Sequence, residues 1–352
     1  MNLQSTRPFP IDRTNNILIR GTNWIGDVIM TLPAVASIRK TMPEATITVL
    51  AKPWVADIYR LSPHVDEVIT FQRPGRHDGL GGLLKLAAEL KEKKFDGTIL
   101  LQNAIQAAII TLTARIPVRA GYNSDGRGLL LTHAVQRTGA IRKVHQIDYY
   151  LEMLKALGFQ SAGHDVTLPV RKDDRARAEE ILFGYGVEKG ETVIGMAPGA
   201  AYGPAKMWLP DRFAALADRL IDRHNAPVLL FGSAGDRAQT DRIEGQAKGK
   251  LINLAGATDL MGAVALIARC NLFISNDSGL MHLAGALGVP LVAIFGSTNP
   301  ATTSPVGEKS VIVHKNVSCS PCLKKTCPTD FRCMKLIEVD DVYEEAKRLL
   351  QD

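Results

Sequence analysis

Residues 272–298 read as strand, turn, helix, turn, strand, and this alternation constrains the fold more than any other part of the chain. Two short apolar runs flank a small-residue helix expected over 280–287. The turn before that helix contains residue types that form turns and cap helices: Asn276, Asp277, Ser278 and Gly279. A helix between parallel strands begins at the carboxyl edge of the sheet, where its unpaired N–H groups can bind an anion. An ordinary βαβ unit with a capped helix is the alternative.

The same alternation runs through both halves of the chain. Strands are expected at 17–20, 45–51, 65–71, 97–101, 119–122, 192–196, 227–231, 272–274 and 291–295, with helical segments between them. Strands that alternate with helices favour doubly wound parallel sheets. A length of 352 residues suits two domains. We therefore expect an α/β protein with two Rossmann-like domains, 1–168 and 175–340, that face each other across a cleft, followed by a C-terminal helix over 341–352 that packs back on the first domain.

Composition is that of a soluble globular protein rather than a membrane or secreted protein. Hydrophobic residues make up 46% and charged residues 22% of the chain. No apolar run reaches the roughly 18 residues that a membrane span needs, and the N-terminus lacks a signal-peptide core. The five cysteines do not follow the spacing of a secreted disulfide scaffold. These features predict a cytoplasmic location.

The positive charge is concentrated in the first half of the chain. Residues 1–170 hold 20 Lys and Arg against 14 Asp and Glu, which accounts for the whole net charge of +6. Such an excess favours an acidic partner for that half: a phosphorylated substrate, an anionic membrane surface or nucleic acid. The basic side chains of its expected loops are Arg73, Arg76, His77, Arg119, Arg127, Arg142 and Lys143. A solvated basic surface without a partner is the alternative.

Three loops of the second half are expected to meet at one sheet edge. They follow strands and cover 198–206, 232–236 and 276–282, which supply backbone N–H groups, a lysine and carboxylates suited to a nucleotide diphosphate. The chain has neither a G-x-x-x-x-G-K-[ST] nor a G-x-G-x-x-G motif. It also lacks any D-x-D pair, which disfavours a metal-clamped sugar nucleotide. Lys206 and helix dipoles are therefore expected to stabilise the negative charge on a leaving diphosphate.

Three motifs in this order resemble the ADP-heptose:lipopolysaccharide heptosyltransferases of glycosyltransferase family 9. They are Gly21-Thr-Asn-Trp-Ile-Gly-Asp-Val-Ile-Met-Thr-Leu-Pro33, Pro198-Gly-Ala-Ala-Tyr-Gly-Pro-Ala-Lys206 and Asn276-Asp-Ser-Gly-Leu-Met-His282. The similarity covers about residues 16–335, and the type that adds the second heptose is the most similar. The resemblance implies a GT-B enzyme that moves L-glycero-D-manno-heptose from ADP-heptose to the lipid-linked inner core of lipopolysaccharide. It implies inversion of the anomeric centre and no cofactor or catalytic metal.

The resemblance also implies roles for individual residues. Asp27 is the expected general base, because inversion needs one base on the acceptor hydroxyl. The expected donor-binding residues are Gly199, Lys206, Asp236, Asp277, Ser278, Gly279 and His282. The expected acceptor-binding residues are Asn23, Trp24, Arg73 and Arg127. For several of these residues a purely structural role is the alternative. Asp27 could stabilise a helix N-terminus, Lys206 could be a solvated lysine, and His282 could be a packed side chain. Trp24 and Trp208 could be core residues rather than contacts to sugar or adenine.

Two features depart from the family pattern or leave it open. Ala201 stands where an acidic residue is expected and Met207 where a basic one is expected, so side-chain contacts to phosphate there are not carried over. Near the C-terminus the spacing C-x2-C-x4-C-x5-C joins Cys319, Cys322, Cys327 and Cys333. Four thiolates at this spacing could bind Zn²⁺, form disulfides or remain reduced in a structural loop.

The leading interpretation is thus a cytoplasmic glycosyltransferase with transient peripheral contact at the inner membrane, where its acceptor lies. A related heptosyltransferase with another acceptor is the main alternative. A non-catalytic protein that binds a nucleotide sugar or nucleic acid is a further one. Nucleic acid is disfavoured, because aromatic residues are only 6% of the chain and no RNA-binding signature accompanies the basic residues.

Overall fold

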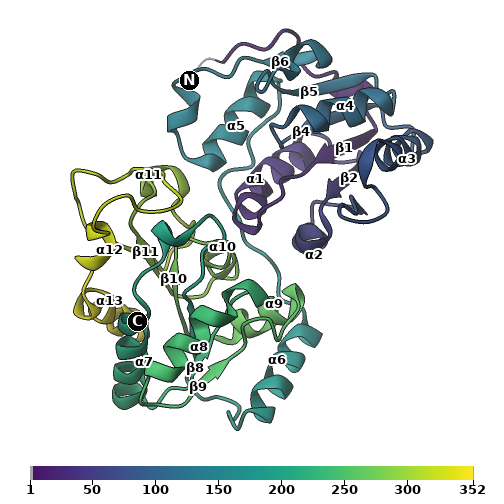
Figure 1. Cartoon of the computed structure of the whole chain (residues 1–352). Helices are drawn as coiled ribbons and strands as arrows, with labels where there is room; N and C mark the ends of the chain where they lie inside the picture. Colours follow the sequence, from purple (N-terminus) through teal and green to yellow (C-terminus); the bar gives the residue numbers. More distant parts are fainter. Residues whose placement is uncertain (1–2, 352) are drawn as a thin grey trace. The chain divides into compact units, whose positions relative to one another are not determined.

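The computed structural model describes residues 3–351, which divide into two compact units (Figure 1). Unit 1 covers Met1–Val166 and unit 2 covers Thr167–Asp352. Each unit is a parallel six-stranded sheet with helices on both faces. Among the described residues, no helix combines the length and the apolar character needed to cross a bilayer.

In unit 1 the sheet order is β3-β2-β1-β4-β5-β6, with every neighbouring pair parallel. The strands are β1 (Asn16–Arg20), β2 (Thr46–Ala51), β3 (Glu67–Thr70), β4 (Gly97–Leu100), β5 (Val118–Tyr122) and β6 (His133–Val135). The helices are α1 (Ile25–Thr41), α2 (Pro53–Leu61), α3 (Gly79–Glu92), α4 (Ile105–Thr113) and α5 (Gln146–Ala156), with short 3₁₀ turns at Ile11–Arg13, Arg127–Leu130 and Ile141–Lys143.

The central strands of unit 1 are buried on both faces, which explains their continuous apolar sequence. Leu18 and Leu50 face α3 and α4 in one apolar cluster. Helix α1 contacts α2 and α5 and continues through Pro33, as the sequence predicted. Its residues from Val28 to Val35 are all buried, so tertiary packing holds a helix that contains an internal proline.

Unit 2 repeats the plan with the order β12-β11-β10-β7-β8-β9, again parallel throughout. The strands are β7 (Ile194–Ala197), β8 (Val228–Leu230), β9 (Leu251–Asn253), β10 (Leu272–Asn276), β11 (Leu291–Phe295) and β12 (Ser310–His314). The helices are α6 (Lys172–Gly184), α7 (Pro210–His224), α8 (Arg237–Gln246), α9 (Leu260–Arg269), α10 (Gly279–Ala286), α11 (Pro300–Thr303), α12 (Arg332–Lys335) and α13 (Val339–Gln351), with 3₁₀ turns at Pro204–Lys206 and Ala234–Asp236.

In both sheets the order in which strands are added reverses at the centre, and this switch point positions the loops that matter for function. The chain proceeds outward from β1 on one side and from β4 on the other, and likewise from β7 and from β10. Ligands of doubly wound folds bind outside the carboxyl ends of the strands at such a switch point. In unit 1 this edge carries the loop before α1, and in unit 2 it carries the loops that follow β7 and β10.

Most of these elements agree with the sequence pattern, but several were not predicted from it. These are α2, α8, α11, α12, β6 and β12, and α5 begins five residues earlier than predicted. The division between units falls at 166/167, close to the expected end of the first domain. The expected C-terminal helix begins at Val339 and packs against α7, β10, β11 and β12 of unit 2. Its buried face completes the core of that unit, and the expectation that it also packs on the first domain stays a prediction.

Candidate active site

The centre of the unit 2 edge is a buried ion pair between Lys206 and Asp277. Lys206 Nζ lies 2.6 Å from Asp277 Oδ2, and the two side chains are 14% and 4% exposed. Thr298 donates its hydroxyl to the same carboxylate oxygen at 2.6 Å. The pair lies between the loops that follow β7 and β10, directly before α10. An ammonium group and the N-terminus of a helix therefore meet at the switch point of this sheet, which suits a phosphate group.

The helix N-terminus itself is organised by Ser278. Its hydroxyl caps α10 by accepting the backbone N–H of Met281 and lies 3.0 Å from the hydroxyl of Ser275. Gly279 is the first helical residue, and His282 lies in the first turn, buried at 5% exposure. The capped turn and the helix that the sequence predicted here are thus present, and donor binding by these residues stays a prediction.

Asn276 fixes the Lys206 loop to β10, whereas its residue type predicted only a turn. Its side chain is fully buried; Nδ2 donates to the carbonyl of Pro198 at 2.6 Å, and Oδ1 accepts the backbone N–H of Trp208 at 3.0 Å. Gln239 of α8 donates to the same Pro198 carbonyl at 2.8 Å. A buried amide side chain at the carboxyl end of a buried strand is the signal that identifies such a brace.

Asp236 ties down the loop after β8 and lies against the loop after β7. Its Oδ2 accepts hydrogen bonds from the backbone N–H and the hydroxyl of Ser233, at 2.8 and 2.6 Å. Its Oδ1 faces Gly199, where an added Cβ would lie 2.4 Å from that oxygen. The carboxylate is half-buried and packed against the loop of Gly199, so the structure gives this expected ribose contact a bracing role as well.

A second support comes from the cysteine-containing segment 319–333. The carbonyl of Lys325 accepts the backbone N–H of Ala205 at 3.0 Å, and the carbonyl of Leu323 accepts the hydroxyl of Tyr202 at 2.8 Å. Gly203 has a φ of +152°, and an added Cβ there would lie 2.5 Å from the Lys325 carbonyl oxygen. Only glycine allows the two segments to approach this closely. Lys206 is therefore presented by a loop that is tied down on both sides.

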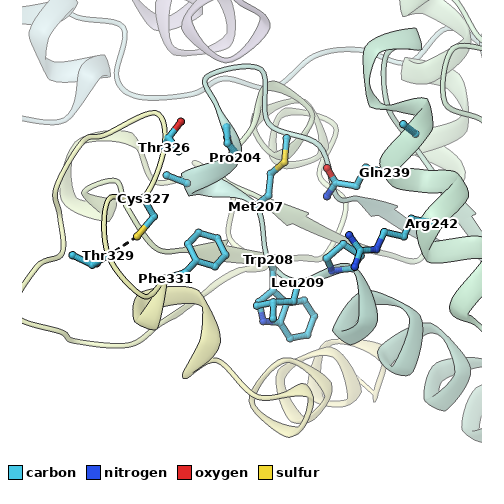
Figure 2. Close-up of a pocket in the computed structure, with 13 residues that line it drawn as sticks. Pro204, Met207, Trp208, Leu209, Gln239, Arg242, Thr326, Cys327, Thr329 and Phe331 are labelled. Atoms are coloured by element: carbon cyan, nitrogen blue, oxygen red, sulfur yellow. Dashed lines mark hydrogen bonds between the residues drawn. The ribbon is translucent and has the colours of Figure 1, made fainter.

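A cavity of about 560 Å³ adjoins this loop (Figure 2). In Figure 2 Gln239 and Arg242 approach it from α8, and Thr326, Cys327, Thr329 and Phe331 approach from the cysteine-containing segment. Its walls are Pro204, Ala205, Met207, Trp208, Leu209, Pro210, Ala238, Gln239, Arg242, Thr326, Cys327, Thr329 and Phe331. Trp208 is 1% exposed and donates Nε1–H to the carbonyl of Ile337 at 2.9 Å, which makes it a core residue.

The cysteines near the C-terminus are free thiols. Burial, reinforced by its three cysteine neighbours, raises the pKa of Cys333, whereas hydrogen bonds from Thr329 lower the pKa of Cys327. Within residues 3–351, no three His, Cys, Asp or Glu side chains are arranged to hold a metal ion. The four thiols considered for Zn²⁺ thus do not form a preorganised site, and their segment serves as the support described above.

In unit 1, Asp27 lies in the first turn of α1 at the switch point of the sheet. It is half-buried and close to Tyr150, whose pKa burial raises well above the usual value and which the Asp27 carboxylate raises further. Asn23 precedes it, accepting Arg20 NH2 on its side-chain oxygen at 2.9 Å. Trp24 is the N-terminal cap of α1 and is 61% exposed. A carboxylate, an amide and an open indole therefore share this edge.

Arg127 differs from the expectation of an acceptor contact. Its guanidinium is fully buried and donates to the carbonyls of Tyr122, Gln102 and Leu100 and to the side-chain oxygen of Asn103. Burial lowers its pKa to about 10. This arginine holds the loops after β4 and β5 in place, so a structural role replaces the expected acceptor contact. Arg73, by contrast, is half-exposed, with Nε 3.7 Å from Asp78.

Several other basic residues of the expected loops are also engaged within the unit. Arg76 pairs with Glu89, His77 is buried at 2% exposure, and Arg119 donates to the carbonyls of Leu130 and Ile116. Arg142 and Lys143 are exposed. The basic excess of this unit is therefore partly structural.

Two doubly wound parallel domains in one chain, each with its polar loops at the switch point, define the GT-B class of glycosyltransferases. Comparison with known proteins specifies the family. The model of glycosyltransferase family 9 (heptosyltransferase) matches residues 83–331. The chain belongs to this family and is a glycosyltransferase.

Curated relatives and solved structures agree with this assignment. The chain is 33% identical to lipopolysaccharide heptosyltransferase 2 of Salmonella typhimurium, over 84% of this chain and 87% of the relative. It is 34% identical to lipooligosaccharide heptosyltransferase 2 of Haemophilus influenzae, over 85% and 88%. The structure of E. coli ADP-heptose lps heptosyltransferase II superposes with a TM-score of 0.82 at 30% identity, covering 96% of this chain and 98% of that one. A family 9 glycosyltransferase from Veillonella parvula superposes with a TM-score of 0.86 at 25% identity, covering 98% and 99%.

Proposed function

We propose that this glycosyltransferase transfers L-glycero-D-manno-heptose from ADP-heptose to the inner core of lipopolysaccharide, as its second heptose. The observation that carries the proposal is the Lys206–Asp277 pair at the N-terminus of α10, on the switch point of the second sheet. A cation and helix N–H groups at this place can bind the negatively charged oxygens of a diphosphate. The names of the relatives, heptosyltransferase 2, supply the sugar and the acceptor.

We propose a reaction that is consistent with the residue types at the two edges. Asp27 takes the proton of the acceptor hydroxyl as its oxygen forms the new bond to the anomeric carbon. The bond from that carbon to the diphosphate oxygen breaks on the opposite face, which inverts the centre and releases ADP. Lys206 and the dipole of α10 stabilise the charge that develops on the leaving diphosphate. Neither role needs a metal, and we propose that the enzyme uses none.

We further propose that the first unit binds the acceptor and the second the donor, and that the enzyme works at the cytoplasmic face of the inner membrane. The basic excess of residues 1–170 supports transient contact with an anionic surface. Arg142 and Lys143 are exposed, and we assign this contact to them among the basic loop residues. Vesicle co-sedimentation across roughly 0.05–0.5 M salt tests this contact, which screening should weaken. Co-sedimentation that does not change with salt would exclude an electrostatic contact.

The test of function is turnover with purified components. The protein is incubated with ADP-heptose and inner-core acceptor that lacks the second heptose, and ADP release and the mass of the product are measured together. Release of ADP with one added heptose supports the proposal. Transfer only to an acceptor that lacks any heptose would indicate the related activity instead, and binding of ADP-heptose without ADP release would indicate a non-catalytic protein.

A further inference from the structure

The carboxyl ends of β1 and β2 carry two buried cations. Arg20 ends β1 and is 1% exposed; Lys52 follows β2 directly and is 8% exposed. Within residues 3–166, neither Arg20 nor Lys52 takes part in an ion pair with an acidic side chain. A buried charge without an ion pair costs free energy unless hydrogen bonds or a ligand of opposite sign compensate it.

Lys52 has few partners inside the unit. Its Nζ donates to the carbonyl of Arg73 at 2.7 Å and lies 4.0 Å from the centroid of the Phe71 ring and 5.5 Å from that of Trp54. An ammonium group has three donors, and one carbonyl accepts from it here. Burial, together with the positive charges of Arg20 and Arg73, lowers the pKa of Lys52 to about 8.

Arg127 shows what a purely structural buried cation looks like in the same unit. Its guanidinium donates to four oxygen acceptors in two neighbouring loops. Lys52 has no comparable set, and the Nε of Arg20 beside it is buried with no hydrogen-bond partner. The positive charge at the end of β2 is therefore less satisfied than the one that holds the β4 and β5 loops.

An open aromatic surface adjoins this charge. Trp54 is 49% exposed, and its Nε1–H donates to the carbonyl of Asn23 at 2.8 Å, which fixes the ring while leaving half of it open. Trp24, one residue after Asn23, is 61% exposed. Rigid indole faces suit the apolar face of a sugar ring. A fixed indole beside a buried cation, on the same sheet edge as Asp27, matches an acidic sugar.

We infer that Lys52 and Trp54, with Arg73 at their border, form a subsite for an anionic sugar of the acceptor. Trp54 packs against the ring, and Lys52 binds its carboxylate or phosphate group. This inference rests on the proposed function, because it takes the acceptor to be a glycan that carries acidic groups. It assigns acceptor recognition to the end of β2 rather than to Arg127.

The test compares Lys52→Met with wild type on three acceptors: untreated inner core, inner core with its carboxyl groups reduced to alcohols, and dephosphorylated inner core. Lys52→Met should raise the acceptor KM roughly 10- to 100-fold, the range for a lost charge-assisted hydrogen bond in a buried site. The KM for ADP-heptose should not change. The loss should disappear on the acceptor that lacks the group bound by Lys52, which tells carboxylate from phosphate.

Controls separate this role from a structural one. Lys91→Met removes an exposed lysine of α3 and should leave both KM values unchanged. Trp54→Phe should retain most acceptor affinity, whereas Trp54→Ala should lose it. Lys52→Met should unfold at no lower denaturant concentration than wild type, because it removes a poorly matched buried charge.

The pH dependence gives a second readout. The charged groups that act on Lys52 are Arg20, Arg73 and Asp78, and the pKa of Lys52 is lowered to about 8. Its protonated form binds the anion, so kcat/KM for the acceptor should fall as pH rises through about 8. Lys52→Arg should move this fall to higher pH, because a guanidinium keeps its proton.

Calorimetric binding of the acceptor without donor distinguishes the two proposals. If wild type releases no ADP, the proposed function fails, and the acceptor Kd of Lys52→Met still decides the subsite. Equal Kd values for Lys52→Met and wild type on untreated acceptor would overturn the inference. The same loss on both modified acceptors would overturn it too, because the effect would then not depend on an acidic group.

Discussion

Breaking the Lys206–Asp277 pair should separate its contribution to stability from its contribution to donor binding. Two unit charges about 3 Å apart attract by roughly 5–6 kcal/mol at an effective dielectric constant of about 20. Removing one partner of a buried pair leaves the other uncompensated and costs about 3–5 kcal/mol. Lys206 is 14% exposed and Asp277 is 4% exposed. Lys206→Met leaves the more buried partner without its counter-charge, so we expect the free energy of unfolding to fall by about 3 kcal/mol. Asp277→Asn leaves an ammonium group that water can reach, so we expect a smaller fall.

The double variant Lys206→Met/Asp277→Asn tests this reasoning, because it removes both charges. Its free energy of unfolding should recover most of the loss seen in Lys206→Met, since no buried charge remains. Its activity should not recover. We expect both Lys206 variants to have a raised KM for ADP-heptose and a kcat reduced about 10²–10³-fold, as for loss of a group that stabilises a leaving charge.

The measurement needs a signal from unit 2 alone, because a two-unit chain need not unfold in one step. Trp208 is buried in unit 2, whereas Trp24 and Trp54 belong to unit 1. In a Trp24→Phe/Trp54→Phe background, the fluorescence of Trp208 follows urea unfolding of unit 2. A change below about 0.5 kcal/mol for Lys206→Met would mean that the pair is solvated like a surface salt bridge, and the argument from burial would be wrong.

Three further outcomes are expected. Asp27→Asn should reduce transfer about 10²–10⁴-fold while calorimetric affinity for ADP-heptose is unchanged, and near wild-type turnover would remove Asp27 from the mechanism. Gly199→Ala places a Cβ 2.4 Å from Asp236 Oδ1 and should weaken ADP-heptose binding by displacing that brace, whereas Gly245→Ala, where the added Cβ meets nothing within 4 Å, should not. EDTA should leave initial rates unchanged, and activity lost to EDTA and restored by Mg²⁺ would refute the metal-free reaction.

Much of the fold can be predicted from the sequence because local pattern and short-range geometry determine it. Continuous apolar runs identify strands buried on both faces, and the turn before α10 is recognisable from residue types alone. Parallel strands that alternate with helices must bring their carboxyl ends to one edge. The positions of Lys206, Asp277 and Asp27 at such edges therefore follow from the chain order, and the three motifs sufficed to indicate the family.

What each polar side chain does at those edges depends on contacts between residues far apart in the chain. Asn276 reaches Pro198, and the Lys325 carbonyl reaches Ala205, through packing that no local pattern encodes. Arg127 and Lys52 look equivalent in the sequence, as basic residues close to strand ends. The tertiary structure surrounds Arg127 with carbonyl oxygens and buries Lys52 against aromatic rings with one acceptor. Burial and the count of available partners decide which cation is structural and which is left to bind a ligand, and both are properties of the folded chain.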